Sequence, residues 1–320
     1  MGSYKNIGTI LIPMFIVLLL SLNYMPCKAQ LSTTFYDNTC PKALKTIRKS
    51  VRDAVASNPR NAALLVRLLF HDCFVQGCDA SLLLEGTGSE KASPANGGVL
   101  GYEVIDAAKA AVESVCPGVV SCADILAVAA RDASVAVQGP SWVVRLGRRD
   151  STTSNASQAL SDLPRGNFNL SQLISSFQVK GLNTREMVAL SGSHTIGQAR
   201  CTRFRGRIYN NTLPIDSTFA TSLRQNCPTT GSDENLEPLD LVTPNKFDNN
   251  YFRNLLTNKG LLVSDQVLFN GDLTDSIVNE YARSTSRFKS DFAAAMVKMS
   301  EIDPLTGSNG VIRTLCTSAT

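Results

Sequence analysis

The sequence is poor in the residues from which many catalytic sites are built. Among 320 residues it has only two histidines, His71 and His194, and one tryptophan. It contains no HExxH segment, no GxSxG segment and no pair of cysteines spaced as CxxC. These absences argue against a zinc site and against a serine hydrolase. Chemistry that needs an imidazole must therefore use one of the two histidines.

Long apolar runs are also scarce. The one clear example, residues 7–22, follows Lys5 and precedes Cys27-Lys28-Ala29. A run of about 16 residues is short for a membrane span, which needs roughly 20, whereas a basic start and a small-residue end are typical of a secretory signal. We interpret 1–29 as a signal peptide, rather than an anchor, and 30–320 as the mature domain. No later stretch is apolar enough to cross a membrane.

Charge of one sign is not in large excess. The chain has 31 basic and 27 acidic side chains, and removal of Lys5 and Lys28 leaves 29 against 27, a net charge of +2. This balance argues against a nucleic-acid partner held by charge. The richest basic runs are expected to be solvated or salt-bridged surface, and they comprise Arg145, Arg148, Arg149, Arg203, Arg205 and Arg207.

Cysteine, by contrast, is well represented, with nine residues. Cys27 would leave with the signal, and an even number behind a secretory signal predicts four disulfides in an oxidising compartment. Spacing alone leaves their pairing open, although Cys73 and Cys78 would close a natural small loop. Three N-x-S/T sequons are candidate glycosylation sites in a secreted chain, at Asn155, Asn169 and Asn210.

Hydrophobic periodicity predicts a mainly helical protein with little strand. A mature chain of this length can bury a large core, in one large domain or two lobes. Asn61 and Asn169 are expected to cap helices. Residues 85–101 and 143–171 are expected to be largely irregular, and the weak strand signals fall near 197–208 and 261–269. The expected helices are 41–57, 62–73, 102–115, 121–137, 170–180, 184–192, 216–226, 249–258, 274–284 and 287–301.

The segment 67–81, RLLFHDCFVQGCDAS, combines several reactive groups. Arg67 and His71 are four residues apart, so on a helix they share a face. The surrounding helix is apolar nearly all round and is expected to be buried, which is unfavourable for both side chains unless each has a partner or a role. A neighbouring cation would keep His71 neutral and able to accept a proton, and Arg67 could stabilise a developing negative charge.

His194 lies at the end of a predicted helix, in the small-residue segment 191–197, SGSHTIG. Small neighbours leave room for a flat group to approach, and an imidazole there could bind a metal or haem iron. Segments 67–81 and 190–197 resemble the distal and proximal motifs of the class III secretory plant haem peroxidases. The resemblance covers essentially all of 30–320, including 146–150, 247–249 and 264–266, and the order of the eight remaining cysteines.

The resemblance implies a mainly α fold, in which two helical lobes with very little β structure enclose one haem b. His194 would be the axial ligand of the iron, and Asp265 would accept its other imidazole proton. Arg67 and His71 would act on peroxide, and Phe70 would shield the distal haem face. Asn96 would fix the tautomer of His71, and Glu90 would be the acid linked to Asn96.

The resemblance also implies two calcium ions and a disulfide pairing. Clustered oxygen ligands on a loop suit calcium. The distal ion would use Asp72, Asp79, the Ser81 hydroxyl and the carbonyls of Val75 and Gly77. The proximal ion would use Thr195, Asp240, Thr243, Asp248 and the Lys246 carbonyl. The implied disulfides are Cys40–Cys116, Cys73–Cys78, Cys122–Cys316 and Cys201–Cys227.

The implied activity is that of a secreted peroxidase, which reduces hydrogen peroxide through a ferryl intermediate and oxidises phenolic donors by one-electron steps. Lignin and suberin formation, wall cross-linking, the response to oxidative stress and removal of peroxide would be its roles. The Pro164 carbonyl would contact the donor, and Gly166 stands where the family often has a second proline. Monolignols, other phenols, auxin and wall-protein tyrosines all stay open as donors.

The implied protein is a monomer without a membrane or nucleic-acid partner. The chain ends four residues after Cys316, which favours the cell wall space over the vacuole. The main alternative is a catalytically silent, calcium-stabilised pectin-binding protein on the same scaffold. The presence of the full set of Arg67, His71, Asn96, His194 and Asp265 argues against that alternative.

Overall fold

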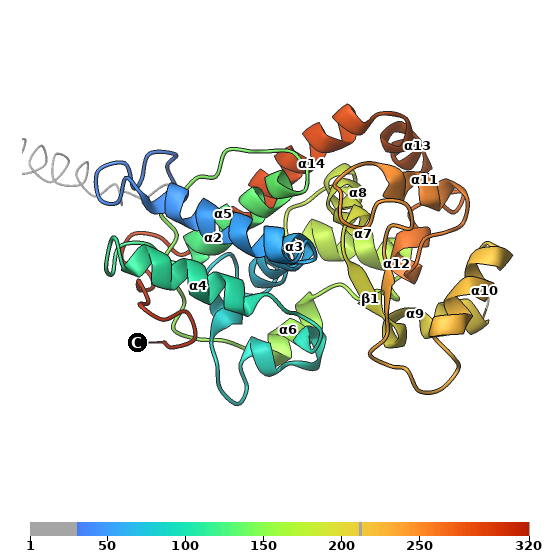
Figure 1. Ribbon diagram of the computed structural model, residues 1–320, viewed down its shortest axis with the longest axis horizontal. Helices are drawn as coiled ribbons and strands as arrows, with labels where there is room; N and C mark the ends of the chain where they lie inside the picture. Colours follow the sequence, from blue (N-terminus) through green and yellow to red (C-terminus); the bar gives the residue numbers. More distant parts are fainter. Residues whose placement is uncertain (1–30, 211–212, 320) are drawn as a thin grey trace, which may run out of the picture. The chain divides into compact units, whose positions relative to one another are not determined.

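The computed structural model describes residues 31–210 and 213–319 (Figure 1). The signal peptide expected at 1–29 lies outside the described residues. The α-helices are α2 Ala43–Ser57, α3 Asn61–Cys73, α4 Tyr102–Glu113, α5 Cys122–Ala136, α6 Ala156–Asp162, α7 Leu170–Val179, α8 Thr184–Ser191, α9 Cys201–Asn210, α10 Ser217–Asn226, α11 Asn250–Leu256, α12 Val263–Gln266, α13 Asp275–Arg283 and α14 Thr285–Met299. Short 3-10 turns are η1 Ser81–Leu83, η2 Glu90–Ala92, η3 Pro94–Asn96 and η4 Gly192–Thr195.

The first group of helices is organised around α3 and α5, which pack against each other. Helix α5 is buried along nearly its whole length, because it is rich in small apolar residues that allow close approach. Helices α2 and α4 pack against α5 and against each other (Figure 1). Arg148 and Asp124, both fully buried, form an ion pair of 2.8 Å that joins α5 to the segment after it.

The second group of helices surrounds an aromatic cluster. Helix α14 packs against α8, and α11 packs against α13. Phe288 lies at the centre of the cluster, in ring contact with Phe247, Phe252, Tyr281 and Phe292. These rings come from α11, α13, α14 and the segment before α11, and they bury enough apolar area to hold these parts together.

Strand structure is sparse, as the sequence predicts, but its position differs. Strand β1 (Gln198–Arg200) pairs antiparallel with β2 (Leu236–Pro238). The strand expected near 197–208 is confirmed only at Gln198–Arg200, since the rest of that segment is helix α9. The strand expected near 261–269 is wrong, since that segment contains α12. In α12 the Asp265 carboxylate accepts a hydrogen bond from the Leu262 backbone N–H at 2.8 Å, which closes the first turn of the helix.

Three local expectations also need correction. Asn61 is the first residue of α3, and its side chain donates to the Ala54 carbonyl at the end of α2 instead of capping α3. Helix α6 was missed in a stretch expected to be irregular; Asn155 caps it. Two members of the basic runs are buried, not surface: Arg148 through its pair with Asp124, and Arg207 through donation to the Gly260 and Pro214 carbonyls.

Four disulfides crosslink the described residues, over separations of 5 to 194 residues. They link Cys40–Cys116, Cys73–Cys78, Cys122–Cys316 and Cys201–Cys227, the pairs that the resemblance implies. The Cys122–Cys316 bridge ties α5 to the end of the chain. Among the described residues, no helix combines the length and the apolar character that a membrane span requires.

Candidate active site

Helix α3 holds Arg67 and His71 on one face, and the turn η3 supplies their partner Asn96. Nδ1 of His71 lies 2.6 Å from Oδ1 of Asn96, and the Asn96 amide donates to the Glu90 carbonyl at 2.8 Å. Because the amide nitrogen of Asn96 is already engaged as a donor, its oxygen must accept from Nδ1–H of His71. This places the lone pair of His71 on Nε2.

Electrostatics keep His71 neutral. Burial, followed by the charge of Arg67, lowers the pKa of His71 to about 3. The Arg67 Nε–H donates to His71 Nε2 at 3.0 Å, so the proton-accepting nitrogen and the guanidinium are in direct contact. A neutral base with a fixed tautomer beside a cation can remove a proton and stabilise the resulting charge.

The burial of the pair differs from the expectation. His71 is buried, but Arg67 is exposed, although α3 is otherwise largely buried. Phe70, next to His71 in sequence, is only partly buried and makes an edge contact with the His71 ring at 5.2 Å between centroids. The Arg67 side chain is thus accessible from one side, yet burial still lowers its pKa to about 10.

His194 lies in η4, directly after α8, and its partner comes from α12. Nδ1 of His194 lies 2.7 Å from Oδ1 of Asp265, which is almost completely buried. The same Oδ1 accepts a hydrogen bond from the Tyr251 hydroxyl at 3.1 Å. The His194 side chain is 34% exposed, and its Nε2 makes no hydrogen bond with any described residue. Nε2 of His194 is thus available to bind a metal or haem iron.

The segment around Pro164 is attached to the helix that carries Asp265. The Gly166 carbonyl accepts a hydrogen bond from the Ser264 backbone N–H at 3.0 Å. Pro164 itself is partly exposed, in the connection between α6 and α7. The structure therefore places Pro164 near the His194 side of the molecule, as part of a segment that is fixed to α12 by its backbone.

Acidic side chains expected at the first calcium site gather after α3. Asp72 Oδ2 accepts from the Ala80 N–H at 3.0 Å, and Asp79 Oδ1 accepts from the Ser81 N–H at 3.0 Å. Burial, followed by the charges of Asp79 and Glu90, raises the pKa of Asp72 well above its usual range. Burial likewise raises the pKa of Asp79 to about 6 and that of Glu90 to about 8.

Two oxygens in this acidic group are unsatisfied. Ser81 Oγ and Glu90 Oε2 are both buried and have no hydrogen-bond partner among the described residues. Buried carboxylates that repel one another, with unpaired oxygens beside them, suit a hard divalent cation. Val75 and Gly77 lie in the same loop; Gly77 has a φ of +116°, and a Cβ there would lie 2.3 Å from the Asp303 carbonyl oxygen.

The residues expected at the second calcium site also come together, in part. Thr195 Oγ1 donates to Asp240 Oδ2 at 2.9 Å, and Thr243 Oγ1 donates to Asp248 Oδ2 at 2.9 Å. Thr195 immediately follows His194, so this group adjoins the candidate iron ligand. Lys246, expected to contribute its carbonyl, is exposed between Thr243 and Asp248.

The residues present fit a haem. Each histidine has Nδ1 held by a buried acceptor, which leaves one Nε2 beside a cation and the other without a partner. An axial imidazole with a carboxylate behind it is the arrangement in which a histidine ligand is most basic.

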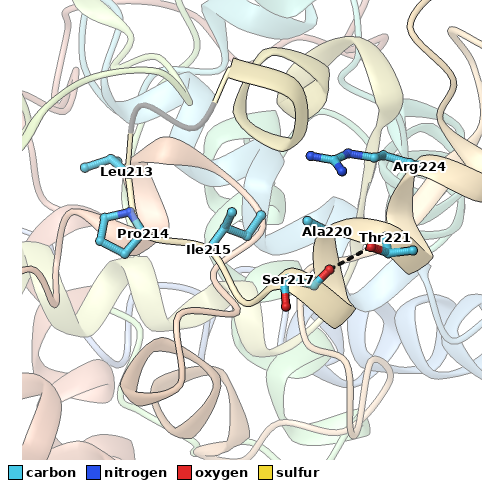
Figure 2. A pocket seen from close by; sticks show the side chains of 7 residues that line it. All are labelled: Leu213, Pro214, Ile215, Ser217, Ala220, Thr221 and Arg224. Carbon is cyan, nitrogen blue, oxygen red and sulfur yellow. Dashed lines mark hydrogen bonds between the residues drawn. The ribbon is translucent and has the colours of Figure 1, made fainter.

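A pocket between the Leu213–Ile215 segment and α10 is a separate feature (Figure 2), because none of the expected site residues lines it.

Tyr251 is the residue of this site that the sequence did not reveal. It lies 14 residues before Asp265, with no motif linking the two. The available signal was indirect: a tyrosine in a buried helix needs a partner for its hydroxyl. Burial and the charge of Asp265 raise the pKa of Tyr251 well above its usual range, so the hydroxyl remains a donor.

Comparison with known proteins agrees with this geometry. A family model described as peroxidase matches residues 47–284. The chain is 74% identical over 317 residues to a basic peroxidase of Zinnia elegans, covering 99% of both chains. It is 62% identical over 304 residues to a lignin-forming anionic peroxidase of Nicotiana sylvestris, covering 94% of both, and 55% identical over 293 residues to peroxidase P7 of Brassica rapa, covering 90% of this chain and 99% of that one. The chain therefore belongs to the class III plant peroxidases, a family of haem enzymes that act on hydrogen peroxide.

Proposed function

We propose that this protein reduces hydrogen peroxide with His71 and Arg67 and oxidises phenolic donors one electron at a time, with a single haem b bound through His194. The proposal rests mainly on the hydrogen bonding of the two histidines, which prepares each one for a different role. Nδ1 of each is held by a buried oxygen. One Nε2 is thus prepared to accept a proton and the other to bind iron.

His71 performs the proton transfer. Its Nδ1–H donates to Asn96, so Nε2 accepts the proton of an arriving peroxide and later returns it to the departing oxygen. A pKa near 3 keeps the imidazole neutral at working pH. Arg67 must first leave the Nε2 that it contacts. The released guanidinium then stabilises the negative charge that develops on oxygen.

Bound haem would supply the redox chemistry, taking two oxidising equivalents from peroxide and passing them singly to the donor. His194 would hold it through Nε2, with Phe70 covering the opposite face. Asp265 accepts the Nδ1 proton of His194 and makes the imidazole a stronger electron donor. The Leu262 N–H and the Tyr251 hydroxyl keep the Asp265 carboxylate in place.

Two calcium ions would rigidify these groups. The distal ion would bind Asp72, Asp79 and Ser81, with the Val75 and Gly77 carbonyls, and relieve the repulsion among the buried acids. Glu90, whose carbonyl holds Asn96, links that site to His71. The proximal ion would bind Thr195, Asp240, Thr243 and Asp248, with the Lys246 carbonyl, and so fix the segment that carries His194.

The assignment of this protein as a peroxidase also supports a proposal for its electron donor and for its location. Phenols would approach near the Pro164 carbonyl, and the name of the Nicotiana relative supports lignin precursors as one class. With 1–29 cleaved as a signal peptide, residues 30–320 would act as a monomer in the cell wall space, with glycans at Asn155, Asn169 or Asn210. The first two sequons begin at exposed helix caps, and Asn210 ends α9.

Purification from a secreting plant or insect host tests the proposal. We expect a Soret band, an N-terminus at Gln30, and oxidation of guaiacol that depends on added peroxide. A His194→Ala variant is the matched control, because it should fold without retaining haem. Wild-type protein that binds haem but leaves guaiacol unchanged with peroxide would refute the proposed activity.

A further inference from the structure

Arginines accumulate beside the distal pair, and only one of them, Arg200, has an acidic partner. Arg203, in the first turn of α9, lowers by its charge the pKa of both Arg67 and His71, after the larger effect of burial. Arg200 and Arg60 act on Arg67 in the same direction. Like charges this close destabilise one another unless an anion joins them.

The Arg203 guanidinium lies beside the turn that follows Asn96. Nη2 of Arg203 lies 3.7 Å from the point that a Cβ on Gly98 would occupy. Arg200 Nη1 donates to the Gly97 carbonyl at 3.3 Å, so the start of α9 lies against Gly97 and Gly98. Asn96 accepts a hydrogen bond from His71. The turn beside Arg203 is therefore the same turn that holds the base.

The four arginines of this group differ in their partners. Arg200 pairs with Glu234 at 2.9 Å, and Arg67 contacts His71. Arg60 is half-buried, and its buried Nε has no hydrogen-bond partner. Arg203 is exposed and makes no hydrogen bond or ion pair with any described residue. Arg60 and Arg203 thus both lack a counter-charge among the described residues, and Arg203 is the one exposed to an anion from solvent.

We propose that Arg203 determines donor specificity by binding the carboxylate of an acidic phenol, such as a hydroxycinnamate. The inference rests on the proposed function and refines it. A phenol with a carboxylate can place its negative group on the Arg203 guanidinium in a paired contact, which brings the ring towards the distal side of the site. A neutral phenol of the same shape gains nothing from Arg203. Selection thus arises from the difference in charge between otherwise similar donors.

The experiment compares 4-hydroxycinnamic acid with its methyl ester as donors for haem-loaded wild-type protein and an Arg203→Gln variant. We expect the ratio of kcat/KM for acid to that for ester to fall about two- to five-fold in the variant, the size that an exposed ion pair provides. The loss should appear in KM. A second, activity-independent measurement is calorimetric binding of 4-hydroxycinnamate to resting enzyme without peroxide, which should weaken by a similar factor.

Arg52→Gln is the matched control, because Arg52 is exposed on α2 and makes no hydrogen bond or ion pair with any described residue. It removes the same charge and should leave the acid-to-ester ratio at the wild-type value. Raising the salt concentration should reduce the acid preference of the wild type but not that of Arg203→Gln.

Three outcomes would overturn the inference. In the first, both donors lose kcat/KM equally in Arg203→Gln. In the second, Arg52→Gln changes the ratio as much as Arg203→Gln does. In the third, Arg203→Gln loses haem or shifts the Soret band, which would show that Arg203 binds the carboxylates of the haem instead of those of a donor. A wild type that oxidises neither donor would instead refute the proposed function, so the two failures are distinguishable.

Discussion

His194 and Tyr251 share one oxygen atom. Nδ1 of His194 lies 2.7 Å from Asp265 Oδ1, and the Tyr251 hydroxyl lies 3.1 Å from the same atom. Two donors on one carboxylate oxygen divide its negative charge between them. Tyr251 therefore limits how strongly Asp265 draws the imidazole proton, although Tyr251 does not face the reacting groups.

Replacing Tyr251 by Phe removes one of the two donors. We expect the hydrogen bond between His194 and Asp265 to strengthen and the imidazole to become a stronger electron donor. The Fe(III)/Fe(II) reduction potential should shift to more negative values, and the iron–histidine stretching frequency of the reduced protein should rise. Spectroelectrochemistry and resonance Raman spectroscopy measure the two quantities.

Tyr209→Phe serves as the control, since it removes a hydroxyl that donates to the Cys227 carbonyl. It should leave both quantities at their wild-type values. A reduction potential that stays constant in Tyr251→Phe would contradict the role assigned to the shared oxygen.

Replacing His71 by Leu removes the base while preserving a side chain of similar bulk. We expect the variant to retain haem, because His194 is untouched, and to react with peroxide about 10²–10⁴-fold more slowly, the range that general acid–base catalysis supplies. Stopped-flow absorbance at the Soret band measures the rate constant. Peroxide reactivity equal to that of the wild type would rule out His71 as the base.

The pH dependence of the peroxide step should reflect the depressed pKa of His71. The imidazole is neutral above a pKa of about 3 and protonated below it, and only the neutral form accepts a proton. The rate constant should therefore be flat from pH 7 to about 4 and decrease as the pH falls through 3. Short pH jumps in a stopped-flow instrument avoid slow acid unfolding. A decrease centred near 6.5, the pKa of an unperturbed histidine, would show that burial and Arg67 do not hold the base neutral.

Removal of calcium should destabilise the protein through the buried acids after α3. Burial, followed by repulsion from neighbouring carboxylates, raises the pKa of Asp72, Asp79 and Glu90, and a bound cation would offset both effects. We expect chelation to lower Tm, with a loss of about 2.7 kcal/mol in unfolding free energy for each site relative to calcium at 100 times its Kd. Differential scanning calorimetry with added calcium should restore the transition.

The Asp79→Asn variant tests whether repulsion among the buried carboxylates causes the loss of stability on chelation. Without calcium this variant should be at least as stable as the chelated wild type, because one buried charge is gone. It should also gain less stability when calcium is added. An equal gain in both proteins would contradict the assignment of Asp79 as a ligand.

Several parts of the protein could be predicted because their signals are local. Asn169 was expected to cap a helix, and it forms a capping box with Gln172 at the start of α7. The same holds for Arg67 and His71, which share a helix face simply because they are four residues apart. Helix periodicity and capping depend on neighbours within one or two turns, so the sequence is sufficient for them.

Other parts depended on partners far away in the chain. Arg67 is exposed on a largely buried helix, and Arg148 is buried in a basic run, because the surroundings of each are built by separate elements. The expected strand at 261–269 became α12, since Asp265 closes the first turn of that helix while it accepts from His194. Contacts between residues such as His194 and Asp265, 71 apart, leave no periodic trace.

The sequence by itself determined the helical class, the two histidines and the acids that follow α3, because composition, spacing and motif order carry that information. Only the tertiary structure decided that Tyr251 shares an oxygen with His194, that Arg67 reaches solvent, and that Arg203 lies beside the distal pair without a counter-charge. The physical reason is that charge, burial and hydrogen bonding depend on distances in space, which the folded chain sets between elements remote in sequence.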